Sequence, residues 1–370
     1  MTFRLYFLDM KTSLFDYKLP KTRIAQRSVS PRDASRLMVL DRKTGRISER
    51  VFHEIGEFLN PGDLLVVNDT KVFRARLLGR LGTGAAAELL LLRPVRNDAK
   101  SSVWEALGKP GKKLRLGTIV SGEGWSVEVV RKGKEGIVEV KFPLGTKAVF
   151  GLLSKIGHIP VPPYVADEPV RESDYQTVYA REVGSIAAPT AGFHFTKRLV
   201  ASLKRKGVKF ASVTLHVGIG TFRPMTADDT DEHKMHSEYA EIPATTLKAI
   251  RETKRRGGRV IVVGTTAMRA LEGLAEASCQ LPVASGSAAA STGHWLLATG
   301  RRAGWLDIFI TPGYRFKVAD ALVTNFHLPK STLLVLVSAF AGRENVMRAY
   351  RRAVRERYRF YSFGDAMLVV

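Results

Sequence analysis

Short apolar runs fill the chain between residues 66 and 140 and predict a compact β structure. The runs VFRARLLGRL, AELLLLRPV, WEALG, WSVEVV and GIVEVKF either alternate apolar with polar residues or stay apolar throughout. Turn residues separate them, as at Pro110-Gly111 and Lys132-Gly133. Runs of this length and spacing are typical of a small antiparallel barrel or sandwich. The prolines of IPVPPY, residues 159–164, then impose an extended path, which we interpret as the linker out of this domain.

Helical and strand patterns alternate after residue 196. Thr196 is a candidate N-cap for a helix over residues 197–206, and Gly207 ends that helix. The strand VKFASVTLHV follows. A helix over 245–256, the strand RVIVV and a helix over 266–274 then repeat the same order. We therefore expect an α/β (α+β) main domain with an inserted small antiparallel β domain, either a β-barrel or a sandwich.

These patterns also predict the domain boundaries. The main domain is expected to consist of residues 10–74 and 159–370, with the barrel domain inserted as residues 75–158. Residues 1–9 are expected to be an N-terminal extension, because Met10 begins MKTSLFDYKLP, a credible native start. The extension offers no small-residue cleavage site of the kind that a secretory signal needs.

The charge balance predicts a polyanionic partner. The chain has 58 Lys and Arg against 35 Asp and Glu, a formal net charge of +23. Such an excess favours nucleic acid or an anionic surface, with solubility alone as the alternative. The longest apolar stretch, residues 332–341, is about half a bilayer span, so we expect no membrane segment and a cytoplasmic location. The single cysteine, Cys279, excludes an internal disulfide framework and a cysteine-rich zinc site.

Two segments match motifs for nucleotide or metal binding, but other structures explain them better. Residues 82–87 fit the G-x-G-x-x-A dinucleotide fingerprint but lie between two strand-like segments, where a hairpin turn is favoured. His233, His236 and Glu238 could supply metal ligands beside three aspartates, or belong to an acidic solvated loop. Because there is no H-E-x-x-H helix, we favour a His and Glu pair available for proton transfer and predict no metal.

A stronger anion site follows the strand RVIVV. Gly264, Thr265 and Thr266 lead from the strand into a helix whose free N–H groups can hold a carboxylate or phosphate. Arg269 lies one turn further along on the same face. An ordinary capped helix is the alternative interpretation.

Polar side chains gather in further loops beside predicted strands, where small residues let backbone approach a ligand closely. In VTNFHLPKS, residues 323–331, Pro329 and Ser331 suit a capped junction, whereas Asn325 and His327 need another explanation. The C-terminal helix carries a row of arginines with interleaved aromatic residues, which suits phosphate contact and base stacking or a solvated face. The candidates in these segments are Tyr175, Gln176, Thr190, His194, His216, Thr221, Asn325, His327, Lys330, Arg351 and Arg355.

Segments in a fixed order resemble one family nearly from end to end. They include FDYKLP, GDLLVVNDTKVFRARL, APTAGFHFT, TLHVGIGTFRP, HKMHSEY, VGTTAMRALE, TNFHLPKSTL and YSFGDAMLV. Together they resemble the S-adenosylmethionine:tRNA ribosyltransferase-isomerases, the QueA family. The resemblance implies an α/β domain with an inserted β-barrel, a monomer, S-adenosylmethionine as co-substrate and tRNA as partner. The implied reaction transfers and isomerises the ribosyl group of S-adenosylmethionine onto 7-aminomethyl-7-deazaguanine at the tRNA wobble position. Its products are epoxyqueuosine, adenine and methionine.

The implied chemistry narrows the roles of the candidate residues. A sulfonium acidifies the neighbouring C5′ hydrogens, so a base could start the reaction, and the leaving adenine would benefit from a proton donor. The candidates for these proton transfers are His194, His216, His236, Glu238 and His327. The candidates for binding S-adenosylmethionine are Gly264, Thr265, Thr266 and Arg269 at the methionine carboxylate, Asn68, Asp69 and Thr70 at the ribose, and Thr190. The candidates for binding the tRNA substrate are Tyr175, Gln176, Thr221, Asn325, Lys330, Arg351 and Arg355.

Two other functional classes compete with this hypothesis. An S-adenosylmethionine-dependent RNA methyltransferase would need a glycine fingerprint between a strand and a helix, and residues 82–87 do not have that context. A non-catalytic RNA-binding protein would need no loops rich in histidine beside strands.

Overall fold

The structure is a computed structural model in which two compact units are distinguished. It describes residues 10–98, 100–134, 136–162, 164–165, 171–218, 237–279 and 300–370, and the single residues 225, 228, 230 and 235. One unit consists of Met1–Thr70, Tyr164–Glu182 and Pro189–Val370, and the other of Lys71–Pro163 and Val183–Ala188. The expected extension, residues 1–9, lies outside the described residues. The domain boundaries expected at 75 and 158 stay a prediction.

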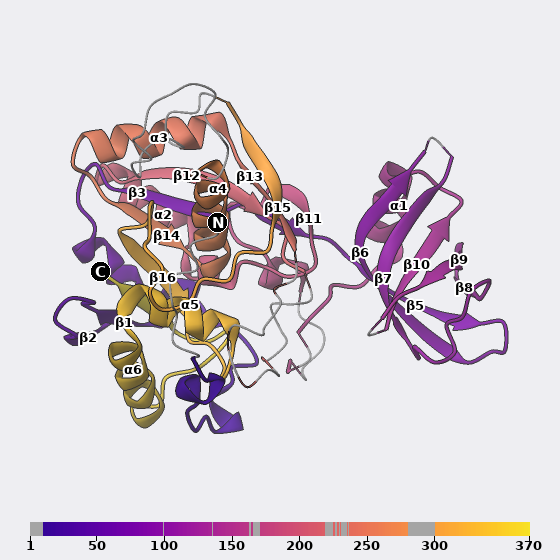
Figure 1. The fold of residues 1–370 in the computed structure, drawn as a ribbon, viewed down its shortest axis with the longest axis horizontal. Coiled ribbons are helices and arrows are strands. Elements are labelled where there is room, and N and C mark those ends of the chain that lie inside the picture. The colour runs from indigo at the N-terminus through magenta and orange to yellow at the C-terminus, as the bar shows by residue number, and fades with distance from the viewer. Residues whose placement is uncertain are drawn as a thin grey trace, which may run out of the picture. The chain divides into compact units, whose positions relative to one another are not determined.

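Six antiparallel strands of the smaller unit close into a barrel in the order β10-β7-β6-β5-β8-β9 (Figure 1). The closed ring selects the barrel over the sandwich. Inside it, Leu89 and Leu91 are fully buried, as the alternating pattern predicted. A tight turn at residues 82–85 joins β5 to β6, which confirms the hairpin interpretation of the glycine motif. The elements are β5 (Arg76–Leu81), β6 (Ala86–Asn97), β7 (Ser102–Lys109), β8 (Ile119–Gly122), β9 (Trp125–Lys132), β10 (Ile137–Phe142) and the helix α1 (Thr146–Ile156).

A nine-stranded mixed sheet forms the centre of the larger unit, in the order β15-β13-β12-β3-β14-β16-β17-β1-β2. Its central strands β12, β3, β14 and β16 run parallel. Every residue of β3, β14 and β16 is buried, as is typical of parallel strands that are covered on both faces. The strands are β1 (Arg36–Leu40), β2 (Ile47–Val51), β3 (Leu64–Asn68), β12 (Lys209–Leu215), β13 (Glu238–Ile242), β14 (Val260–Val263), β15 (Arg302–Leu306), β16 (Ala321–Asn325) and β17 (Ala366–Val369). A separate two-stranded ladder joins β4 (Thr70–Val72) to β11 (Glu182–Ser185).

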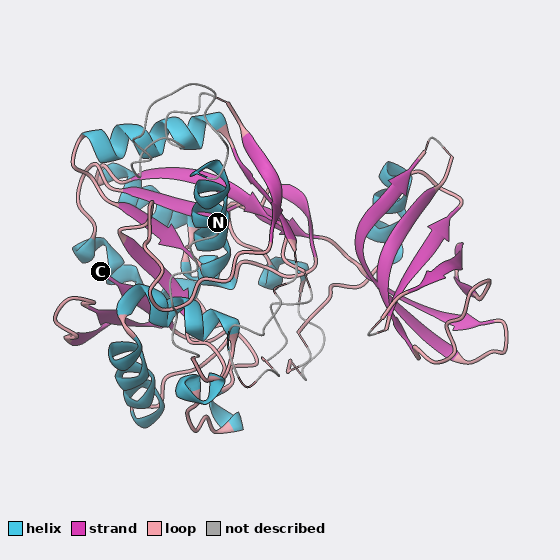
Figure 2. Ribbon diagram, viewed as in Figure 1, coloured by secondary structure: helices cyan, strands magenta, loops and turns pink. Residues whose placement is uncertain are grey.

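Helices pack against this sheet, whereas the barrel is built almost wholly of strands (Figure 2). One core joins Leu65 and Val67 of β3 to Leu199 and Leu203 of α2. No helix of the described residues is long and apolar enough to cross a membrane. The helices are α2 (Lys197–Arg205), α3 (Ala244–Arg255), α4 (Thr265–Cys279), α5 (Thr332–Ala341) and α6 (Arg343–Arg355).

Both helix caps predicted from the sequence are present. Thr196 Oγ1 accepts a hydrogen bond from Leu199 N at 3.1 Å at the start of α2. Ser331 Oγ accepts one from Leu334 N at 3.3 Å at the start of α5. Each cap satisfies one backbone N–H that would otherwise lack a partner in the first turn. The helix predicted over 266–274 begins one residue earlier and continues to Cys279.

The side chain that caps α2 also contacts a buried carboxylate, so its replacement should lower the stability of the fold. Thr196 Oγ1 also donates to Asp33 Oδ2 at 2.7 Å, and Asp33 is 1% exposed. Thr196→Ala removes the cap and leaves a buried carboxylate with fewer donors. We expect the free energy of unfolding, measured by urea denaturation, to fall by about 1–3 kcal/mol. Thr196→Ser keeps both hydrogen bonds and should stay within about 0.5 kcal/mol of the parent. An equal loss in the two variants would contradict the capping role.

Candidate active site

The carboxyl ends of four parallel strands meet at one edge of the large sheet. His216 directly follows β12, Thr70 lies just beyond β3, Gly264 directly follows β14, and Asn325 ends β16. Open α/β sheets bind their ligands at this kind of edge, because the loops diverge there and helix N-termini face it. The fold thus brings to one edge several polar residues that are far apart in the sequence.

Asn68 ties three elements together at this edge. Its Nδ2 donates to Leu215 O at 3.0 Å and to Thr266 Oγ1 at 3.2 Å. Its Oδ1 accepts from Leu215 N and from Thr70 N, both at 3.1 Å. The amide therefore uses both donors and both acceptor positions within the protein. Asn68 fixes the geometry of β3, β12 and the start of α4.

Asp69 is held on the other face of the strand end. Its Oδ1 accepts from Thr214 Oγ1 at 2.7 Å, and its Oδ2 forms an ion pair with Arg181 Nη2 at 2.9 Å. The carboxylate is 2% exposed, so these two partners replace the water that it loses on folding. Arg181 was not among the residues that the sequence singled out.

His216 is the half-buried histidine of the edge. Its Nδ1 lies 2.8 Å from Thr70 Oγ1, and its ring stacks on Tyr239 at 6.1 Å between centroids. Burial lowers the pKa of His216, although the carboxylates of Asp69 and Glu182 oppose the shift. The imidazole is therefore neutral near pH 7 and can accept a proton.

His194 lies in a buried chain of hydrogen bonds with Asn325. Ser35 Oγ lies 2.7 Å from His194 Nδ1, and Asn325 Nδ2 lies 3.1 Å from His194 Nε2. Thr190 Oγ1 donates to Asn325 Oδ1 at 3.0 Å. The imidazole also stacks on Phe52 at 4.8 Å. Both nitrogens of the His194 ring have protein partners, so this series of hydrogen bonds orients the loops around the edge.

His327 is buried by the C-terminal part of the chain. Its Nε2 lies 2.8 Å from Thr324 Oγ1, and its backbone N donates to Tyr350 Oη at 3.1 Å. Its backbone carbonyl accepts from the Tyr17 hydroxyl. The polar loop of residues 323–331 is therefore mostly an internal junction, with His327 packed inside it.

Glu238 and Arg269 form a buried ion pair beside the first turn of α4. Arg269 Nη1 contacts Glu238 Oε2, and both side chains are nearly inaccessible. Glu238 Oε1 also accepts from Gly218 N at 2.9 Å, and Arg269 Nε donates to Ile308 O at 3.3 Å. The Nη2 group of Arg269 is buried, and the described residues leave it without a hydrogen-bond acceptor.

A glycine turn leads directly from β14 into α4. Gly264 has a φ of +91°, a conformation that side chains disfavour, and it is followed at once by the helix. Thr265 and Thr266 occupy the first turn, where backbone N–H groups lack helical partners. Thr266 Oγ1 already accepts one hydrogen bond, from Asn68 Nδ2.

Glu272, one turn beyond Arg269, was missed by the sequence reasoning. Its carboxylate accepts from the backbone N–H groups of Lys317, Val318 and Ala319 at 2.8–3.1 Å. Burial raises the pKa of Glu272, against the effect of these donors. Nothing in the local sequence set Glu272 apart from the other polar residues of α4, such as Glu276. Glu272 anchors α4 to the segment that leads into β16.

Three of the expected substrate contacts lie in settings that differ from one another. Tyr175 is fully buried and packs against the rings of Phe193 and Phe363. Gln176 is half-buried, and its backbone carbonyl accepts a hydrogen bond from Arg32 Nη1 at 2.7 Å. Lys330 is partly exposed and forms an ion pair with Asp16 at 3.1 Å. Thr221 and His236 lie outside the described residues.

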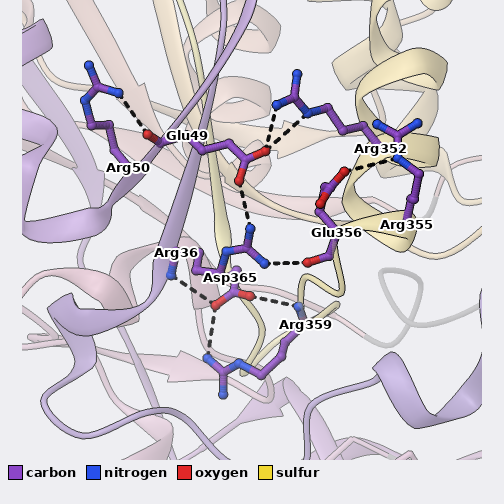
Figure 3. A network of polar contacts seen from close by, with 8 residues as sticks. All are labelled: Arg36, Glu49, Arg50, Arg352, Arg355, Glu356, Arg359 and Asp365. Atoms are coloured by element: carbon purple, nitrogen blue, oxygen red, sulfur yellow. Dashed lines mark hydrogen bonds and ion pairs between the residues drawn. The ribbon is translucent and has the colours of Figure 1, made fainter.

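The arginines in and just after α6 differ in their partners, and Figure 3 shows the contacts of Arg352, Arg355 and Arg359. Arg352 reaches Glu49 at 2.9 Å, and Arg359 reaches Asp365 at 3.2 Å. Arg355 is exposed and pairs with its neighbour Glu356, and Arg351 is also exposed. The prediction that the aromatic rings between these arginines stack on bases is wrong, because all three rings are buried in the core. Those rings are Tyr350, Tyr358 and Phe360.

Comparisons with known proteins give one consistent result. The family model described as "Queuosine biosynthesis protein" matches residues 12–369. The S-adenosylmethionine:tRNA ribosyltransferase-isomerase of Thermotoga maritima is 50% identical over 363 residues, which cover 98% of this chain and 100% of the relative. The protein of that name from Moorella thermoacetica is 48% identical over 366 residues, with the same coverage. A crystal structure of S-adenosylmethionine tRNA ribosyltransferase from T. maritima aligns with a TM-score of 0.54 and 41% identity over 97% of this chain and 100% of that one.

The two deeply buried histidines make stability depend on pH. Burial lowers the pKa of His327 to about 3, and burial with the charges of Arg359 and Arg32 lowers that of His194 to about 3. In the unfolded chain both rings bind protons below about pH 6.5. The folded chain does not bind them until about pH 3, so acid favours unfolding.

We therefore expect the free energy of unfolding to fall as pH drops below about 6.5, with a slope approaching 1.4 kcal/mol per pH unit for each histidine. Urea denaturation at about pH 7 and about pH 5 measures that slope. His327→Gln should reduce the slope by up to about 1.4 kcal/mol per pH unit. His53→Gln, at an exposed position, is the control. A His327→Gln slope equal to that of the control would contradict the assignment.

Proposed function

The chain belongs to the family of queuosine biosynthesis proteins, and from that premise we propose that it is an S-adenosylmethionine:tRNA ribosyltransferase-isomerase. The enzyme transfers the ribosyl group of S-adenosylmethionine to 7-aminomethyl-7-deazaguanine at the tRNA wobble position and isomerises it to epoxyqueuosine. The observation that carries the proposal is the polar edge of the large sheet. There His216, a proton acceptor, follows β12, and α4 after β14 supplies both a helix N-terminus and the buried guanidinium of Arg269, in a chain that matches these relatives along its length.

His216 is the proposed proton acceptor of the reaction. The Thr70 hydroxyl can donate to Glu182 O at 3.5 Å, so it accepts from His216 Nδ1–H and leaves a lone pair on Nε2. His216 is also half-buried and neutral, as a general base must be. This combination supports His216 over the other histidines described at the edge, whose rings are deeply buried.

The other nominated residues take supporting roles in this proposal. Glu238 is a positioning residue, because its carboxylate is committed to Arg269 and to Gly218 N. His194, Thr190 and Asn325 likewise orient loops rather than transfer protons. His236 remains a nominated proton donor for the leaving adenine.

The start of α4 is the proposed site of the methionine carboxylate. Backbone N–H groups at Thr265 and Thr266 carry partial positive charge, which favours a carboxylate. The N–H of Gly264 already donates to Val323 O at 2.8 Å, so Gly264 shapes the turn rather than holding the ligand. Arg269 Nη2 supplies a further donor that has no partner among the described residues. Thr70, which contacts His216 and whose backbone N is held by Asn68, is the proposed ribose contact, while Asn68 and Asp69 hold the edge in shape.

The tRNA contacts proposed on this unit use its exposed cations. Arg351 and Arg355 project from α6 and suit phosphate oxygens, as does Lys330 beside Asp16. Tyr175 and Gln176 support the neighbouring loop. Because tRNA is an intracellular substrate, we propose that the protein works in the cytoplasm, and the family resemblance supports a monomer.

One incubation separates this proposal from a methyltransferase and from a non-catalytic RNA-binding protein. The protein is mixed with S-adenosylmethionine and tRNA that carries 7-aminomethyl-7-deazaguanine, and the products are identified by mass spectrometry. We expect free adenine, free methionine and a nucleoside of the mass of epoxyqueuosine. Release of S-adenosylhomocysteine would instead support a methyltransferase, and unchanged reactants would support RNA binding alone.

Replacing His216 tests its role as the base. His216→Asn should lower kcat for adenine release by about a hundredfold to ten-thousandfold, the usual contribution of general base catalysis. KM for tRNA should stay unchanged, because the His216 ring lies beside the proposed S-adenosylmethionine site and not among the proposed tRNA contacts. His53→Asn, at an exposed position of the same unit, is the matched control and should keep full turnover. Normal turnover of His216→Asn would remove this residue from the mechanism.

A further inference from the structure

Two loops at one end of the barrel carry exposed positive charge that the candidate active site does not use. The first loop, residues 109–118, joins β7 to β8, and the second, residues 133–136, joins β9 to β10. Every cation in or directly beside these loops is exposed to solvent. We call them the barrel cation cluster: Lys109, Lys112, Lys113, Arg115, Lys132 and Lys134.

The two loops are held side by side. Lys132 Nζ donates to Gly111 O at 3.1 Å, and Gly108 N donates to Gly136 O at 3.0 Å. These contacts bring a cation-rich loop and a cation-rich turn to the same end of the barrel. The six charges therefore form one surface.

The first loop is also fixed in shape. Leu114 is fully buried in the barrel, and Gly108 makes room for it, because a side chain at Gly108 would overlap Leu114. Gly117 N donates to Val129 O at 2.9 Å and secures the far end of the loop. With Leu114 directed inward, its exposed neighbours on both sides are presented to solvent at low entropic cost on binding.

Carboxylates do not neutralise this surface within the described residues. On the wall of the barrel, three glutamates each pair with an arginine, whereas no residue of the cluster forms an ion pair with a described residue. Glu135, in the second loop, lies outside the described residues. The wall pairs are Glu88 with Arg76, Glu105 with Arg93, and Glu139 with Arg131.

We propose that the barrel cation cluster binds the phosphodiester backbone of the tRNA substrate without reading its sequence. This inference rests on the proposed function, which supplies a polyanionic substrate. The loops hold no aromatic ring and no amide side chain, the groups that stack on bases or read their edges. Clustered lysine and arginine on a rigid loop instead suit contacts that position a nucleic acid. An anionic membrane surface is the competing partner, since Leu116 is 73% exposed in the same loop.

The test neutralises three of the charges in the full chain with Lys112→Gln, Lys113→Gln and Arg115→Gln. We expect KM for tRNA to rise at least about tenfold near physiological salt, with kcat and KM for S-adenosylmethionine unchanged. The slope of log kcat/KM for tRNA against log salt concentration should become shallower by about three, one for each lost phosphate contact. A charge-preserving set, Lys112→Arg, Lys113→Arg and Arg115→Lys, should retain the parent KM.

The matched control removes the same charge elsewhere on the barrel unit, with Lys100→Gln, Lys147→Gln and Lys155→Gln at exposed positions. It should leave KM for tRNA unchanged. An equal rise in KM in both glutamine sets would show a general charge effect and overturn the inference, as would no rise in the cluster set.

Direct binding separates this inference from the proposed function. Fluorescence anisotropy with unmodified tRNA should show weaker binding by the cluster set alone, even if the parent chain released no adenine. In that outcome the proposed function fails and the barrel interface stands. Binding to phosphatidylserine vesicles that is lost in the cluster set, together with unchanged tRNA affinity, would overturn the inference in favour of a membrane.

Discussion

The edge of the large sheet depends on the hydrogen bonds of one buried amide, that of Asn68. An amide out of contact with water is stable only when its donors and acceptors are all engaged. Asn68 meets that requirement by joining β3 to the end of β12 and to the start of α4. The positions of His216 and of the α4 turn relative to each other follow from this one side chain. Low-dielectric surroundings make such a satisfied network strong and make any broken member costly.

The same rule governs most of the polar groups that surround the edge. Asp69, Asn325 and Glu238 are all buried and all committed to protein partners. Against this background, the few polar atoms with remaining capacity are the ones suited to a ligand. Among the described residues they include Arg269 Nη2 and the N–H groups in the first turn of α4 beyond Gly264. The site is rigid where its groups pair with each other and reactive where they do not.

The sequence predicted the elements well because local patterns encode them. Alternation and turn residues predicted a small antiparallel barrel or sandwich, and the hydroxyls of Thr196 and Ser331 marked two helix starts. Partners across long sequence separations were not predictable. Nothing local indicates that Arg352 meets Glu49, or that the rings of Tyr350 and Tyr358 turn into the core. Periodicity shows which residues share a helix face but not what that face meets.

The strand order of the large sheet has a consequence for how the chain folds. The barrel strands are consecutive in sequence, so they can pair soon after they leave the ribosome. In the large sheet, β17 comes last in sequence yet lies between β16 and β1. Until β17 is made, β1 and β16 have no partner along that side, and the sheet remains in two separate parts. The barrel can therefore form early during synthesis, while the catalytic sheet is joined only when the final strand arrives, and until then its unpaired strands are open to aggregation.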